Sequence, residues 1–261
     1  MIGKKKTAIL GLVALVALLG ASAARAVRDK DGNLEGAFHG TIAPAKLPRH
    51  GSAPVAVQMG GKITTTDKSV PPKLERVILE INRFGVLQRA GLPTCPLAKL
   101  NSISSAGAKK ACGGALVGHG NVTSRVVLPG QGAFASNGPL LAFNGRYKGG
   151  PAIFAQVATG APLPLTYVII FQVKRHKGTF GTSLIGTVPP IASEYGYISA
   201  FDLLLKRTYT YHGQELSYAS ASCPAPDSLS GAIFQFARVS YEFAGKQVLT
   251  GIVERSCRAK G

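Results

Sequence analysis

Short extended stretches, broken by glycine, proline and asparagine, run through almost the whole chain. One of them covers residues 73–82, where Val77, Leu79 and Ile81 fall on one face, and another covers residues 165–176. Such stretches have the length and the side-chain alternation of β-strands. We expect roughly eleven or twelve of them, whereas helical periodicity is scarce. The pattern predicts a mostly β protein, and specifically an antiparallel two-sheet β-sandwich.

Two further expectations follow from these stretches. Three turns of the form aromatic-x-Gly separate them, at Asn144-Gly145, His212-Gly213 and Ala244-Gly245. The Asn-Gly pair is a strong signal for a two-residue hairpin. The predicted core draws on the apolar positions of the strands, namely Val77, Leu79, Ile81, Val168, Ile170, Leu203, Leu205, Phe234 and Phe236.

The N-terminus has the layout of a secretory signal peptide. Lysines at residues 4–6 precede an uncharged apolar run over residues 7–20, and small residues follow as far as Ala26. A basic head, a short apolar segment and an A-x-A end are typical of such peptides. We therefore predict a signal peptide at residues 1–26, with cleavage after Ala26, although Ala23 also fits the cleavage pattern. A retained membrane anchor is the alternative, but the apolar run is short for a span of about 20 residues.

The rest of the chain is predicted to form one unit. Residues 27–35 are expected to be a polar leader, and residues 36–261 a single β-sandwich domain. Within the leader, Asp29, Asp31 and Asn33 alternate as at the start of a calcium-binding loop. The later glycine and glutamate of such a loop are missing from their positions, so a flexible linker is the better interpretation.

The chain is strongly basic. It carries 30 Lys and Arg against 12 Asp and Glu, a net charge of +18, and removal of Lys4, Lys5, Lys6 and Arg25 would leave +14. Such a charge favours anionic partners such as cell-wall polymers, acidic glycans, lipid headgroups or nucleic acid. The alternative is that the charge serves only solubility.

The four cysteines are Cys95, Cys112, Cys223 and Cys257. An even number of cysteines in an exported chain predicts disulfides. Sequence order favours the pairs 95–112 and 223–257, although four cysteines allow three pairings and a nested arrangement stays open. The cysteine spacings match neither a zinc site nor a redox C-x-x-C pair.

A short helical insertion is predicted between the first two cysteines. Pro96 suits the first turn of a helix, and the serines at 104 and 105 suit an N-cap. Gly113 and Gly114 then suit a helix end. The pair Cys95 and Cys112 would pin this insertion against the ends of strands.

Several segments together resemble a family of exported bacterial proteins to which no activity is assigned. They are GLPTC and ACGGALVGHG around the first two cysteines, CPAP at Cys223 and SCR at Cys257. The match covers nearly the whole chain after residue 26 and includes all four cysteines. The resemblance implies export and cysteine bridging, and it implies no catalytic residue, cofactor or partner.

Two basic clusters are candidates for binding a polyanion. The first contains Lys174, Arg175 and Lys177 after an apolar strand, and the second contains Lys206 and Arg207 close to Tyr209 and Tyr211. Cations beside aromatic rings can hold a polyanion or stack on sugars and bases. The alternative is that they are solvated strand ends that resist edge-to-edge aggregation.

His119 is the one histidine singled out. It lies between Gly118 and Gly120, and a glycine frame would allow a ligand to approach closely. The alternative is a surface histidine at the end of a strand. No G-x-S-x-G, phosphate-binding loop or dinucleotide-binding motif is present in the sequence.

These observations favour a secreted, non-enzymatic binding or structural protein of the cell envelope. We expect an anionic cell-wall polymer or glycan as its ligand. We expect no catalytic residue, metal, cofactor, specific nucleic-acid partner or stable membrane span after signal removal. An extracellular hydrolase of glycans or esters is the alternative, and it would require a pocket holding His119 or two acids within about 5–10 Å of each other.

Overall fold

The computed structural model describes residues 26–160, 162–192 and 194–260. The predicted signal peptide therefore lies outside the described residues, apart from Ala26. In those three ranges, no helix is both long and apolar enough to cross a membrane.

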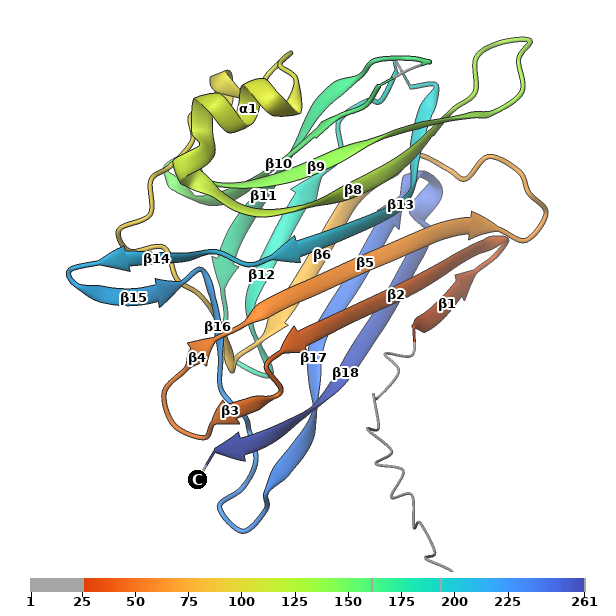
Figure 1. The fold of residues 1–261 in the computed structure, drawn as a ribbon. Helices are drawn as coiled ribbons and strands as arrows, with labels where there is room; N and C mark the ends of the chain where they lie inside the picture. The colour runs from red at the N-terminus through yellow and green to blue at the C-terminus, as the bar shows by residue number, and fades with distance from the viewer. Residues whose placement is uncertain (1–25, 161, 193, 261) are drawn as a thin grey trace, which may run out of the picture.

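Thirteen strands form one large sheet (Figure 1). In spatial order they are β1 (Val27–Asp31), β2 (Leu34–Ala43), β5 (Ala56–Thr65), β13 (Gly196–Leu205), β8 (Leu116–Val126), β9 (Phe134–Tyr147), β10 (Gly150–Ala158), β11 (Thr166–Arg175), β12 (Phe180–Thr187), β6 (Leu74–Asn82), β17 (Gly231–Phe243), β18 (Val248–Lys260) and β3 (Lys46–Pro48). Neighbouring strands are antiparallel except for the parallel pair β18 and β3.

Two small sheets and a few short helices complete the fold. β14 (Thr208–Tyr211) pairs with β15 (Gln214–Ser217), and β16 (Ala219–Ala221) lies between β4 (Ala53–Pro54) and β7 (Gly85–Leu87). The helical elements are η1 (Leu97–Lys99), α1 (Ser105–Cys112), η2 (Gly113–Ala115) and η3 (Ala244–Lys246).

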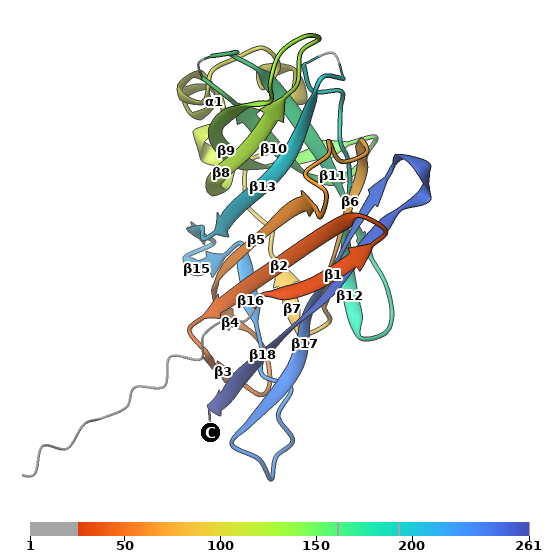
Figure 2. The ribbon, with the colours of Figure 1, turned by 90° about the vertical axis from the view of Figure 1, so that its right-hand side faces the viewer.

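The large sheet curls until its two ends meet, as the two views at right angles show (Figures 1 and 2). β18, near one end of the strand order, lies against β1 and β2 at the other end. Acidic side chains of β1 bridge this seam: Asp29 accepts a hydrogen bond from the Thr250 backbone N–H (2.6 Å), and Asp31 accepts one from the Val248 backbone N–H (2.9 Å). Residues 27–35, which the sequence predicts to be a polar leader, form β1, the turn after it and the first two residues of β2.

The predicted two-sheet sandwich is wrong in its architecture, although the mostly β class is confirmed. The strand order is continuous, so one curled sheet encloses the core instead of two sheets facing each other. Register shifts between Leu116 and Gly118, between Ile198 and Ala200, and between Gln235 and Ala237 interrupt regular pairing. Such bulges bend a strand and increase its twist, which favours curling.

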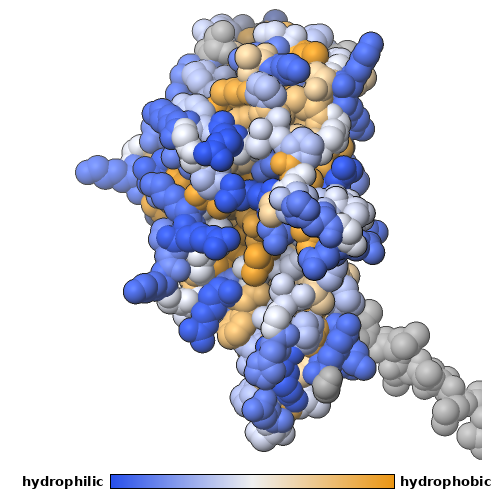
Figure 3. Space-filling model, turned by 90° about the vertical axis from the view of Figure 1, so that its left-hand side faces the viewer, coloured by the Kyte–Doolittle hydropathy of each residue, from blue (hydrophilic) through white to orange (hydrophobic). Residues whose placement is uncertain are grey.

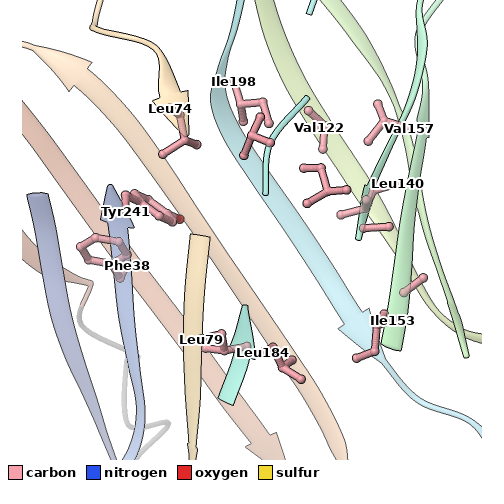
Figure 4. Packing of buried hydrophobic residues seen from close by; sticks show 14 of the residues in the cluster. Phe38, Leu74, Leu79, Val122, Leu140, Ile153, Val157, Leu184, Ile198 and Tyr241 are labelled. Carbon is pink, nitrogen blue, oxygen red and sulfur yellow. The ribbon is translucent and has the colours of Figure 1, made fainter. Parts of the chain in front are cut away.

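The main core fills the inside of the curl. Figure 4 shows Phe38, Leu79 and Tyr241 on one side of the interior, and Leu140 and Ile153 on another. Three of the predicted core residues are buried in this core, namely Leu79, Leu205 and Phe236. Four more are partly buried and pack against it, namely Val77, Ile81, Leu203 and Phe234.

Val168 and Ile170 belong to a second core on the outer face of the sheet. They pack, partly buried, with the residues around α1, while Tyr167 and Ile169 of the same strand are buried in the main core. β11 is thus covered on both faces, because side chains alternate along a strand.

The structure corrects one predicted turn and confirms two. Asn144 and Gly145 lie inside β9, and the chain turns after Tyr147 instead. Asn144 is buried, and its side chain donates a hydrogen bond to the Pro93 carbonyl (2.9 Å). The turn at His212-Gly213 joins β14 to β15, and the turn at Ala244-Gly245 joins β17 to β18.

The cysteines pair in sequence order. One disulfide joins Cys95 to Cys112, and the other joins Cys223, just after β16, to Cys257 in β18. The helical insertion between the first pair is confirmed: Ser104 caps α1 by accepting a hydrogen bond from the Gly107 N–H (3.2 Å). Disulfides persist in oxidising compartments, so both bonds are consistent with an exported protein.

Candidate anion-binding cleft

Three arginines gather at one end of the curled sheet. Each comes two residues after an apolar residue that packs against the main core: Arg83 after Ile81, Arg89 after Leu87 and Arg175 after Val173. Side chains two apart on a strand share a face, so Arg175 continues the inward-facing row of β11. The arginines therefore mark the point where the apolar interior meets solvent.

These arginines line one cleft, together with His176. Its volume is about 260 Å³, and its remaining lining residues are glycine, threonine or apolar, with Val173 and Leu87 among them. No carboxylate belongs to this lining. We call it the arginine cleft. It combines several cationic side chains with an apolar wall.

The acidic residues that form ion pairs do so elsewhere. Glu80 pairs with Arg238, and hydrogen bonding to Glu80 raises the pKa of Arg238. Across the described ranges, none of the arginines of the cleft forms an ion pair. Their charges are therefore not neutralised by the protein, which leaves them available to an anionic ligand.

Arg89 also affects the pKa of the buried Tyr218 side chain. Burial raises the pKa of Tyr218, and the positive charge of Arg89 opposes that rise only in part. Tyr218 therefore stays a neutral phenol at physiological pH and offers no negative charge to Arg89. The Tyr218 backbone N–H donates a hydrogen bond to the Arg207 carbonyl (2.8 Å). Arg207, which belongs to the second predicted basic cluster, therefore lies next to Tyr218.

The structure brings together only part of the predicted polyanion site. Arg175 lines the cleft, and Lys174 and Lys177 are exposed next to it in the sequence. Lys206 is exposed at the end of β13, outside the cleft lining. Arg207 is half-buried, and its Nε has no hydrogen-bond partner within the described part of the chain.

Sequence reasoning missed Arg83 and Arg89. Neither lies in a run of basic residues, so charge clustering along the chain could not reveal them. Each of these arginines lies two residues after a core residue at the end of a strand, and that position could have identified it as a candidate for the site. Arg83 also lies over the ring of Phe84, with 5.1 Å from its guanidinium carbon to the ring centroid.

The glycines that flank His119 have a packing role in the sheet. A Cβ atom on Gly120 would lie 1.8 Å from the backbone oxygen of Asp202, and one on Gly118 would lie 2.7 Å from that of Leu204. These glycines let β13 approach β8 closely. His119 itself is exposed and does not line the arginine cleft.

One contact has the elements of a nucleophile and its base. His176 Nε2 lies 2.7 Å from Ser183 Oγ. Ser183 is only 3% exposed, so a substrate carbonyl cannot reach its hydroxyl in this arrangement. In the described ranges, His176 forms no ion pair with a carboxylate that could orient it.

The surface around the small sheets mixes charged and apolar groups. Figure 3 views the left-hand side of Figure 1, and hydrophilic side chains there border a central hydrophobic strip.

Within the described residues, no group of three or more His, Cys, Asp or Glu is placed to hold a metal ion.

No family model, curated protein or solved structure matches this chain.

Proposed function

We propose that this protein is a secreted, non-enzymatic binding protein of the cell envelope, and that its ligand is an anionic polymer or glycan held in the arginine cleft. One observation carries the proposal: Arg83, Arg89 and Arg175 line a single cleft whose lining contains no carboxylate. Guanidinium groups bind sulfate, phosphate and carboxylate through paired, charge-assisted hydrogen bonds.

The rest of the molecule supports this role. The excess of basic residues attracts polyanions over a distance and raises their local concentration. The two disulfides and the predicted signal peptide both support a location in an oxidising compartment outside the cytoplasm. The resemblance to exported bacterial proteins agrees with the same location.

A charge-removal experiment tests the cleft. The double variant Arg83→Gln/Arg175→Gln is expected to bind a sulfated hexasaccharide at least about tenfold more weakly than the unaltered protein, because each lost guanidinium removes charge-assisted hydrogen bonds. Isothermal titration calorimetry at low salt measures the affinity. Binding by the unaltered protein is also expected to weaken as salt is added.

The matched control is Lys109→Gln/Lys110→Gln on α1. These lysines are exposed, they lie outside the cleft, and their removal changes the net charge by the same amount. The control is expected to keep the affinity within about threefold, because lysines outside the cleft contribute only long-range attraction and make no direct hydrogen bonds to the bound ligand. Equal losses in both double variants would show that net charge, and not the cleft, binds the polyanion.

A further inference from the structure

The inward-facing rows of two strands pass from apolar to cationic in the same direction. On β11 the row is Ile169, Phe171, Val173 and Arg175, and on β6 it is Val77, Leu79 and Ile81, followed by Arg83. The interior of the curl is thus an apolar space that ends at a group of arginines. A ligand complementary to it would have an apolar part and an anionic end.

Internal cavities lie along this direction. The larger has a volume of about 100 Å³, and apart from His39 and Tyr241 its lining residues are apolar or glycine. A second cavity of about 50 Å³ shares His39, Met59, Leu79, Leu205 and Val239 with the first. The two cavities therefore lie next to each other.

Strand β7 links the smaller cavity to the arginine cleft. Its residues Gly85–Leu87 line both the smaller cavity and the cleft. The cleft is therefore adjacent to the smaller cavity at β7, and the smaller cavity is adjacent to the larger one through their five shared lining residues. Met59 lies where the cavities meet, and an unbranched thioether side chain adapts readily to a change in packing.

The larger cavity suits an apolar group better than water. A buried water needs about two to four polar partners, and this lining offers few. The Tyr241 side chain is 1% exposed, and its hydroxyl has no hydrogen-bond partner within the described ranges. Gly61 leaves room for that hydroxyl, since a Cβ atom there would lie 2.2 Å from the Tyr241 oxygen.

We propose that the anionic glycan held in the arginine cleft is amphiphilic: its anionic head lies on Arg83, Arg89 and Arg175, and a hydrocarbon tail that it carries lies in the two cavities. This inference rests on the proposed function and names the chemical class of the ligand. An engineered cavity of about 150 Å³ holds benzene, so the cavities together fit a tail of about six carbons. The anionic end stays in the cleft because the three arginines there offer charge-assisted hydrogen bonds, whereas the cavity linings are largely apolar.

Calorimetry with octanoate, butyrate and octanol tests the inference. Each methylene that enters an apolar cavity improves affinity by about fourfold, so octanoate is expected to bind at least about 30-fold more tightly than butyrate. Octanol has the same chain length but no charge. Its affinity is expected to stay within about twofold in Arg175→Gln, whereas that of octanoate falls at least about tenfold.

A second pair of variants addresses the tail. Ala155 lines the larger cavity, so Ala155→Leu is expected to fill it and reduce octanoate affinity to that of butyrate, with butyrate affinity unchanged. Tyr241→Phe removes one oxygen atom without narrowing the cavity, and it is expected to keep octanoate affinity within about twofold. Thermal unfolding of each variant establishes that it is folded before titration.

The outcomes separate the two proposals. If butyrate and octanoate bind equally, or if folded Ala155→Leu binds octanoate as the unaltered protein does, the tail site is disproved while the cleft stands. If neither the sulfated hexasaccharide nor octanoate responds to loss of Arg175, the cleft is not the anion site and both proposals fail.

Discussion

Replacing Cys223 and Cys257 together by alanine is expected to lower the free energy of unfolding by about 4 kcal/mol, because the bond closes a loop of 34 residues in the unfolded chain. Chemical denaturation of the oxidised protein and the double variant measures the difference. The bond also ties the segment after β16 to β18. Its loss therefore affects the end of the curled sheet where the cleft lies.

The matched comparison is Cys95→Ala/Cys112→Ala. Its loop spans 17 residues, so the expected loss is about 3 kcal/mol. Only the 223–257 variant is expected to weaken hexasaccharide binding as well, since β16 pairs with β7, which leads directly to Arg89. Unchanged unfolding in the 223–257 variant would mean that this bond does not stabilise the fold. Equal weakening of binding by both variants would refute its specific link to the cleft.

Gly120→Ala is expected to have a comparably large effect. The added methyl group would lie 1.8 Å from the Asp202 backbone oxygen, so β8 and β13 would have to separate in the middle of the sheet. We expect a loss of at least about 3 kcal/mol in the free energy of unfolding, or failure to fold. Denaturation midpoints and the yield of folded protein measure it.

Gly113→Ala serves as the control for that substitution. A Cβ atom on Gly113 would meet no atom within 4 Å, and its backbone is right-handed helical with φ of −57°. Alanine there is expected to leave stability unchanged or to raise it by up to about 1 kcal/mol. A Gly120→Ala variant as stable as Gly113→Ala would contradict the close packing of β8 against β13.

The local features of the fold could be predicted from the sequence because each has a local cause. Alternation of apolar residues identified strands such as β6 and β11, and capping serines with a following glycine pair identified the helical insertion. The order of the strands depends on which edges pair over long distances. The continuity of the curled sheet, from β1 at one end to β18 near the other, was therefore not predictable from single segments.

Two errors have particular physical reasons. Asn144-Gly145 resembles a hairpin turn, but the pair is used inside β9: Gly145 makes room for the Phe154 ring, and Asn144 holds the Pro93 segment by a hydrogen bond. Asp29 and Asp31 look like polar linker residues, yet their carboxylates accept backbone hydrogen bonds from β18. In both cases the partner is distant in the sequence.

The candidate site was only partly predictable for the same reason. Arg175 belongs to a basic run that charge clustering detects, whereas Arg83 and Arg89 are isolated in the sequence. They join Arg175 only because the ends of β6, β7 and β11 come together in the folded chain. Lys206 and Arg207 form an equally clear run, but the fold leaves them outside the cleft lining.

Side-chain NMR of the arginines shows whether the anion binds in the arginine cleft. Arginine Nε–H resonances are followed while the sulfated hexasaccharide is added to the oxidised protein. We expect saturable shifts of Arg83, Arg89 and Arg175, whereas Arg125 and Arg146, which lie outside the cleft lining, stay unchanged. Shifts spread evenly over all arginines, or confined to residues outside the cleft, would show that the cleft is not the binding site.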